Sequence, residues 1–129
     1  MLLRQRTDGD CGVAALVLLT EQPYDRAAAA VAAVIEATRN VDRDGLLNRH
    51  VLAAAEALGA PLCPRRAFDL DRDEGILRLY LKHGSSPSGH FVAVRRGLIL
   101  CPSDGVPTDW RHYQVRFTAR FGTLLRRTR

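Results

Sequence analysis

Residues 5–16 form a polar turn that meets an apolar run at a cysteine: Gln5-Arg6-Thr7-Asp8-Gly9-Asp10-Cys11-Gly12-Val13-Ala14-Ala15-Leu16. Thr7, Asp8 and Asp10 belong to the residue types that cap helix N-termini, and the run after the cysteine is uncharged as far as Thr20. This pattern predicts a helix over residues 10–20.

Cys11 falls in the first turn of that predicted helix. Free backbone N–H groups and the positive end of the helix dipole stabilise an anion there, which favours a reactive thiolate near neutral pH. Gln5 lies upstream and can offer an amide N–H to the same space. The alternative is a buried structural cysteine, which is what most free cysteines are. A base elsewhere in the chain is needed to choose between them.

The composition fits one globular domain covering residues 1–129, long enough to bury a core. No apolar run is long enough to span a membrane, and the first residues lack the features of a secretory signal. Three cysteines without paired spacing argue against a disulfide framework and for a reducing compartment. We therefore expect a cytoplasmic protein.

The net charge of +5 is distributed unevenly along the chain. Residues 1–64 carry six Arg against eight Asp and Glu, whereas residues 65–129 carry thirteen Lys and Arg against six Asp and Glu. A basic half is compatible with an acidic partner. The arginines form no recognisable nucleic-acid-binding motif, so we do not expect a nucleic acid as the partner.

Two further helices are predicted before the middle of the chain. Pro23 can open a helix over residues 24–38, and apolar residues at helical spacing predict another over residues 45–58. Gly59 then serves as a C-terminal cap. His50 lies on the last of these helices, where we expect it at the surface or its boundary, without a catalytic role.

The second half changes to the alternation of a half-buried sheet. The predicted strands cover residues 76–82, 90–95, 98–101 and 112–121, and the tail after Gly122 is expected to fray. Helices followed by an antiparallel sheet make an α+β fold.

A cysteine nucleophile requires a base, an acceptor that orients the base, and donors for the oxyanion. His90 opens a predicted strand directly after Gly89, a rigid position from which to project an imidazole. His83 and His112 could serve as the base on chemical grounds alone. The acceptor should come from residues 101–104, and Gln5 with the Cys11 backbone N–H can form the oxyanion hole.

Three segments resemble the papain-like cysteine peptidases, and among them most closely the bacteriocin-leader peptidases that cut after a double glycine. Gln5-x5-Cys11-Gly12-x-Ala14-Ala15-Leu16 is similar to the start of their active site, and Gly89-His90-Phe91-Val92-Ala93-Val94 to their histidine strand. Residues 52–59 resemble the end of their third helix, so the likeness spans about residues 5–105. The resemblance implies a papain-like fold with Gln5 as oxyanion residue, Cys11 as nucleophile and His90 as base.

The third catalytic position departs from the family pattern. The family has an Asp-Pro pair after the return strand, whereas this chain has Cys101-Pro102-Ser103-Asp104-Gly105. Asp104 could reach the imidazole through a different turn; Cys101 or a backbone carbonyl could also hold the ring. Full peptidase activity depends on this position.

The resulting prediction is a cysteine peptidase acting on a peptide or protein, with no cofactor and no metal. Two alternatives remain open. One is a glutamine deamidase or acyltransferase using the same residues, and the other is a catalytically impaired peptide-binding module. A place in a larger secretion or phage assembly also remains open.

Overall fold

A computed structural model describes residues 11–40, 46–81, 89–102 and 106–128 of the chain. Its helices are α1 (Cys11–Thr20), α2 (Tyr24–Val34), α4 (Asn48–Ala57) and α5 (Trp110–Phe117). Its strands are β1 (Leu62–Arg65), β2 (Gly75–Tyr80), β3 (His90–Arg95), β4 (Leu98–Leu100), β5 (Pro107–Asp109) and β6 (Arg120–Arg127). The predicted α+β fold is confirmed, with α1, α2 and α4 preceding the sheet.

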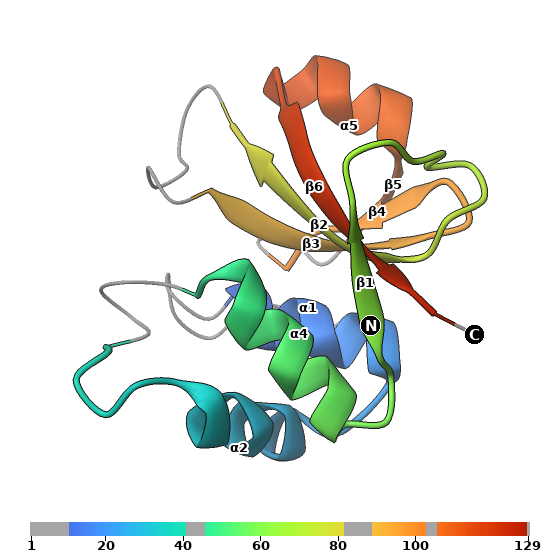
Figure 1. Ribbon diagram of the computed structural model, residues 1–129. Coiled ribbons are helices and arrows are strands. Elements are labelled where there is room, and N and C mark those ends of the chain that lie inside the picture. The colour runs from blue at the N-terminus through green and yellow to red at the C-terminus, as the bar shows by residue number, and fades with distance from the viewer. Residues whose placement is uncertain (1–10, 41–45, 82–88, 103–105, 129) are drawn as a thin grey trace.

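The six strands form one antiparallel sheet in the order β1-β6-β2-β3-β4-β5. Helices α1, α2 and α4 lie on one face of this sheet, and α5 lies on the other (Figure 1). The last strand of the chain therefore runs between β1 and β2, in the interior of the sheet. In the register of β2 with β3, Leu79 lies opposite His90.

Helix α1 is the central element of the helical layer because it packs against β3, α2 and α4. A helix surrounded on several sides must be apolar around most of its circumference. Seven of its ten residues are buried, and Leu16 and Leu19 are among the largest fully buried side chains. The uncharged run after Cys11 thus has a direct explanation in the packing.

Strand alternation divides the core between the two faces of the sheet. The helix-side core lies between the sheet and α1, α2 and α4, and it receives Ile76 from β2 and Phe91 from β3. The α5-side core lies between the sheet and α5, and it receives the next residues along those strands, Leu77 and Val92. Neighbouring positions of one strand therefore serve opposite cores.

The predicted strand over residues 112–121 is wrong in its first part, which forms α5. Trp110, Tyr113 and Phe117 follow helical spacing and lie on the inner side of this helix, against the α5-side core. Asp109 caps the helix because its side chain accepts a hydrogen bond from the Arg111 backbone N–H. The alternation of residues 113–117 is thus coincidental, since Val115 is 81% exposed.

The predicted fraying of the C-terminal tail is also wrong. Strand β6 extends to Arg127, and its Leu124 and Leu125 are fully buried on opposite faces of the sheet. The two apolar residues belong to an interior strand rather than to a solvated tail. Pairing with both β1 and β2 fixes the segment.

The helices predicted over residues 24–38 and 45–58 exist with narrower bounds, and the strand over residues 90–95 is confirmed. Helix α2 ends at Val34, because Ile35 is extended, with φ −86° and ψ 155°. Helix α4 ends before Gly59, whose φ of +79° suits the glycine cap that was predicted. None of the described helices is long and apolar enough to cross a membrane.

Candidate active site

Cys11 is the first residue of α1 and is half-buried against the helix-side core. The glycine that follows it lies in close contact with Leu46 and in ordinary contact with β3. A Cβ placed on Gly12 would lie 2.6 Å from Leu46 Cδ1 and 3.5 Å from Phe91 Cδ2. Gly12 therefore allows the close approach of Leu46, and the start of α1 also makes ordinary contact with Phe91 at the start of β3.

His90 is the first residue of β3, as predicted, and is only 9% exposed. Gly89 leads into it with φ +91°, a backbone conformation that favours glycine. A Cβ at Gly89 would also lie 3.0 Å from Tyr80 Cε1 and 3.1 Å from the Leu79 carbonyl oxygen. The positive φ and the lack of space for a Cβ both restrict residue 89 to glycine. The backbone position from which the His90 side chain projects is thereby fixed.

Cys101 holds the imidazole of His90 at one ring nitrogen. The distance from His90 Nε2 to Cys101 Sγ is 3.4 Å, and both residues are buried. Cys101 directly follows β4, which pairs with β3. The prediction that a residue after the strand paired with β3 contacts the His90 imidazole is thus consistent with the geometry. The group in contact is the thiol of Cys101.

Tyr113 is the residue of this cluster that sequence reasoning missed. Its hydroxyl donates a hydrogen bond to Cys101 Sγ over 3.4 Å, and the side chain is 1% exposed. Tyr113 comes from α5, which was predicted as a strand. The helical spacing of Trp110, Tyr113 and Phe117 after a capping Asp109 is the signal that could have located it.

The two halves of the candidate site belong to different faces of the sheet. Phe91 packs on the helix side near Gly12, whereas the His90 ring contacts Cys101, a member of the α5-side core. A reaction that uses both Cys11 and His90 would therefore take place at the end of the sheet where α1 and β3 begin. Gln5 and Asp104, the predicted oxyanion residue and the predicted third catalytic residue, lie outside the described residues.

The other histidines have different surroundings. The expectation that His50 lies at the surface or its boundary is wrong, because its side chain is 1% exposed. Both of its ring nitrogens have partners. Nδ1 accepts the Leu47 backbone N–H at 2.9 Å, and Nε2 lies 3.0 Å from Glu36 Oε2. His112 is exposed on α5, and His83 lies outside the described residues.

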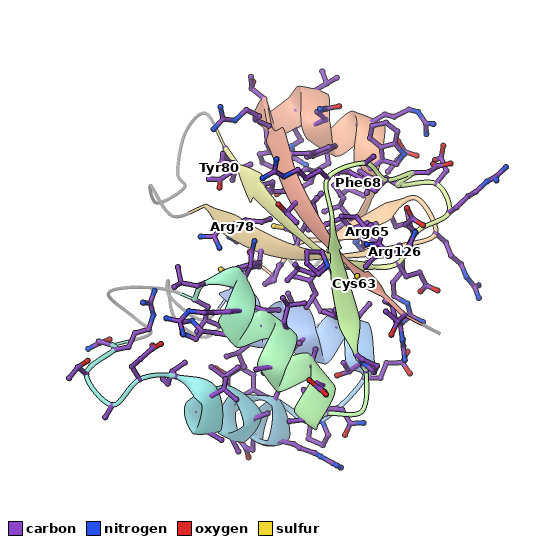
Figure 2. All side chains as sticks on the ribbon, viewed as in Figure 1. Cys63, Arg65, Phe68, Arg78, Tyr80 and Arg126 are labelled. Carbon is purple, nitrogen blue, oxygen red and sulfur yellow. The ribbon has the colours of Figure 1, made fainter. Side chains whose placement is uncertain are left out.

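The sheet end at which β3 begins carries two arginine–aromatic pairs. Arg78 lies over the Phe91 ring at 4.9 Å, and Arg120 lies over the Tyr80 ring at 5.0 Å. Arg78 also donates to the Leu46 carbonyl and to Asn48 Oδ1. Figure 2 shows Arg78 and Tyr80 toward this end, on the strand next to β3. Arg78 thus lies on the Phe91 face of the sheet, as does Tyr80 two residues along the same strand, whereas the His90 ring contacts Cys101 on the opposite face.

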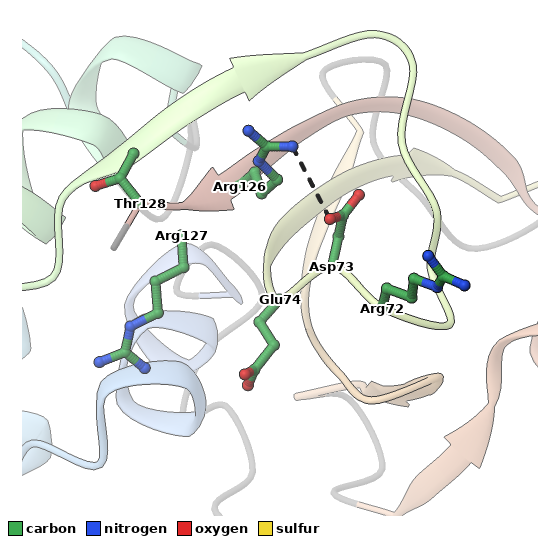
Figure 3. Close-up of a pocket in the computed structure, with 6 residues that line it drawn as sticks. All are labelled: Arg72, Asp73, Glu74, Arg126, Arg127 and Thr128. Atoms are coloured by element: carbon green, nitrogen blue, oxygen red, sulfur yellow. Dashed lines mark ion pairs between the residues drawn. The ribbon is translucent and has the colours of Figure 1, made fainter.

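A separate pocket of about 540 Å³ lies at the opposite end of β2. It is lined by Arg72, Asp73, Glu74, Arg126, Arg127 and Thr128 (Figure 3). Arg126 and Asp73 form a loose ion pair of 4.0 Å across it, and the Thr128 hydroxyl donates to the Pro61 carbonyl. Because this pocket adjoins Gly75 whereas His90 pairs with Leu79, we do not assign the chemistry to it.

No protein-family model, curated protein or solved structure matches this chain.

Proposed function

We propose that the protein is a thiol hydrolase of papain-like fold, and most simply a cysteine peptidase. The observation that carries the proposal is the junction of α1 and β3, where the start of the cysteine helix packs against the start of the histidine strand. The imidazole at that junction is buried and held at Nε2. The proposal places Cys11 Sγ and the His90 imidazole together at this end of the sheet, since thiol hydrolysis requires a nucleophile beside an oriented base.

In the proposed mechanism, Cys11 Sγ gives its proton to His90 and attacks an amide carbonyl of the substrate. The imidazolium then donates this proton to the leaving amine as the C–N bond breaks, which leaves a thioester on Cys11. A water molecule, deprotonated by His90, releases the acid and regenerates the thiol. The Gln5 amide and the Cys11 backbone N–H are assigned to the oxyanion.

We assign His90 Nδ1 as the basic atom, because Nε2 is the ring nitrogen that lies against Cys101. An imidazole that donates Nε2–H to an acceptor carries its lone pair on Nδ1. The arginines at this sheet end also favour a substrate with an acidic side chain or a free carboxylate near the bond that is cut.

The test is the rate of Cys11 alkylation by iodoacetamide as a function of pH, followed by peptide mapping. The parent should react well below the pH of about 8.5 at which an ordinary thiol titrates. His90→Ala should shift the curve to that ordinary range, whereas the exposed His112→Ala should not shift it. Cys63, half-buried on β1, provides an internal reference in the same sample.

An ordinary Cys11 curve that is the same in parent and His90→Ala would overturn the catalytic assignment. Peptide binding without cleavage would then favour the binding-module alternative, whose support is the cysteine in place of the family's aspartate. With an activated thiol, mass spectrometry of peptide substrates separates cleavage from glutamine deamidation. Those two reactions differ in leaving group and acceptor rather than in the residues used.

A further inference from the structure

The cluster of His90, Cys101 and Tyr113 links three elements through two contacts to one sulfur atom. His90 Nε2 and the Tyr113 hydroxyl each lie 3.4 Å from Cys101 Sγ. The three residues are 9%, 4% and 1% exposed, respectively. A buried polar group is costly unless it is hydrogen-bonded, so contacts inside this core are structurally significant.

The sulfur has two potential donors, and their roles can be worked out from the groups present. The Tyr113 hydroxyl is the donor in its contact with the sulfur. If Cys101 gave its own proton to Nε2, the imidazole would carry N–H at Nδ1 and lose the lone pair assigned to catalysis. If Nε2–H donates instead, the sulfur accepts two hydrogen bonds and Nδ1 remains basic.

We infer that Cys101 and Tyr113 are positioning residues for His90, with Cys101 Sγ as the acceptor of Nε2–H and the Tyr113 hydroxyl as its supporting donor. This assignment rests on the proposed function, because it specifies how the base of that reaction is oriented. The Tyr113 hydroxyl donates to Cys101 Sγ, so the sulfur already acts as an acceptor in this cluster. In this arrangement the sulfur does what a carboxylate does beside a catalytic histidine.

The assignment gives α5 a role in the site. The helix lies on the face of the sheet opposite α1 (Figure 1), and its Tyr113 contacts Cys101, the residue that meets the His90 ring. Its ring packs against Phe117 in a tilted arrangement, with ring centroids 4.7 Å apart, which restricts the direction of the hydroxyl. A positioning residue on this helix would be found neither near Cys11 in the sequence nor on the same face of the sheet.

The direct test is the ¹⁵N spectrum of the His90 ring, which distinguishes the nitrogen that carries a proton from the one with a lone pair. The parent should show Nε2 protonated in the neutral ring. Cys101→Ala should mix the two tautomers, and Tyr113→Phe should do so to a smaller extent. Cys101→Ser and Cys101→Asp retain an acceptor and should keep Nε2 protonated. Cys63→Ala and Tyr24→Phe are matched controls on β1 and α2 and should change nothing.

Turnover should follow the same order as the spectra. We expect Cys101→Ala to lower kcat about tenfold and Tyr113→Phe about threefold, both with unchanged KM, as for the loss of one hydrogen bond each. Cys101→Asp should equal or exceed the parent, because a carboxylate is the stronger acceptor. Retained amide spectra would verify that each variant is folded.

An unchanged His90 tautomer in folded Cys101→Ala and Tyr113→Phe would overturn the inference. A larger change in Asp104→Ala than in Cys101→Ala would also overturn it, and would assign the third position to Asp104. Because the tautomer is measured without substrate, this outcome is separate from the fate of the proposed function. That function is judged by the alkylation of Cys11.

Discussion

Replacement of His50 by alanine should destabilise the protein strongly, although this histidine has no role in the proposed reaction. His50 is the third residue of α4, and its Nδ1 accepts the backbone N–H of Leu47, the residue before the helix. This is the reach-back of a capping box, made by an imidazole in place of Glu or Gln. Since Nδ1 accepts, Nε2 carries the proton and donates to Glu36.

The expected loss comes from two effects that the structure defines. Removal of the cap interaction costs about 1 kcal/mol. Truncation of a ring that is 1% exposed leaves a cavity in the core and costs about 2 kcal/mol more. The contact with Glu36 is left out of this figure, because that carboxylate is solvent-exposed and screened. His50→Ala should therefore lower the free energy of unfolding by about 3 kcal/mol.

Urea unfolding followed by circular dichroism measures this loss, with His112→Ala as the exposed control expected within about 0.5 kcal/mol of the parent. His50→Gln keeps an acceptor at the same helix position and should recover about 1 kcal/mol relative to His50→Ala. A loss below about 1 kcal/mol for His50→Ala would refute the buried placement. A glutamine variant no better than alanine would refute the cap.

Three further predictions concern a close backbone contact in the sheet, the hydrogen bonds of a surface aspartate, and stability in acid. Gly75→Ala should lower the free energy of unfolding, measured in urea, by about 3 kcal/mol. The new Cβ would collide with the carbonyl oxygen of Leu125 on the neighbouring strand. The control Gly59→Ala has open space around the new Cβ but a φ of +79°, and should lower the free energy of unfolding by only about 1 kcal/mol. Asp71→Ala should make the single tryptophan, Trp110, more accessible to acrylamide quenching of its fluorescence, because Asp71 accepts hydrogen bonds from Arg111 and from Trp110 Nε1. The hydrogen bonds from Arg111 and then from Trp110 hold the pKa of that carboxyl below its usual range. Equal quenching in parent and variant would contradict this. A backbone hydrogen bond and hydrogen bonds from Arg49 and His50 lower the pKa of Glu36 from 4.5 to about 2. The contribution of this carboxylate to stability is therefore complete above pH 4.5 and is lost as the pH falls toward 2. Acid unfolding curves of Glu36→Gln should lack the loss of stability between those two pH values.

The α+β fold and most of its elements follow from local patterns in the sequence. The apolar run after Cys11, the glycine stop at Gly59 and the residues of β3 define their elements because near neighbours determine capping, periodicity and turns. The position of His90 at the start of its strand was predicted on the same basis.

The segment that forms α5 and β6 was predicted wrongly because its local pattern supports two interpretations. Tyr113, Val115 and Phe117 alternate as in a strand, whereas Trp110, Tyr113 and Phe117 repeat as in a helix. Packing against the α5-side core selects the helix, and the interior position in the sheet selects a strand for residues 120–127. Such a choice depends on contacts that residues close in sequence do not make.

The sequence by itself determined the residue types of the candidate site and the elements that carry Cys11 and His90. Only the tertiary structure decided which groups meet the imidazole, since Cys101 and Tyr113 lie on segments that fold next to His90 from different directions. The tertiary structure likewise decided that His50 is buried and hydrogen-bonded to Leu47 and Glu36. The sequence pattern showed no partner for this histidine. Hydrogen-bond partners of buried groups depend on the three-dimensional approach of separate elements, and a one-dimensional pattern of polar and apolar residues does not encode that approach.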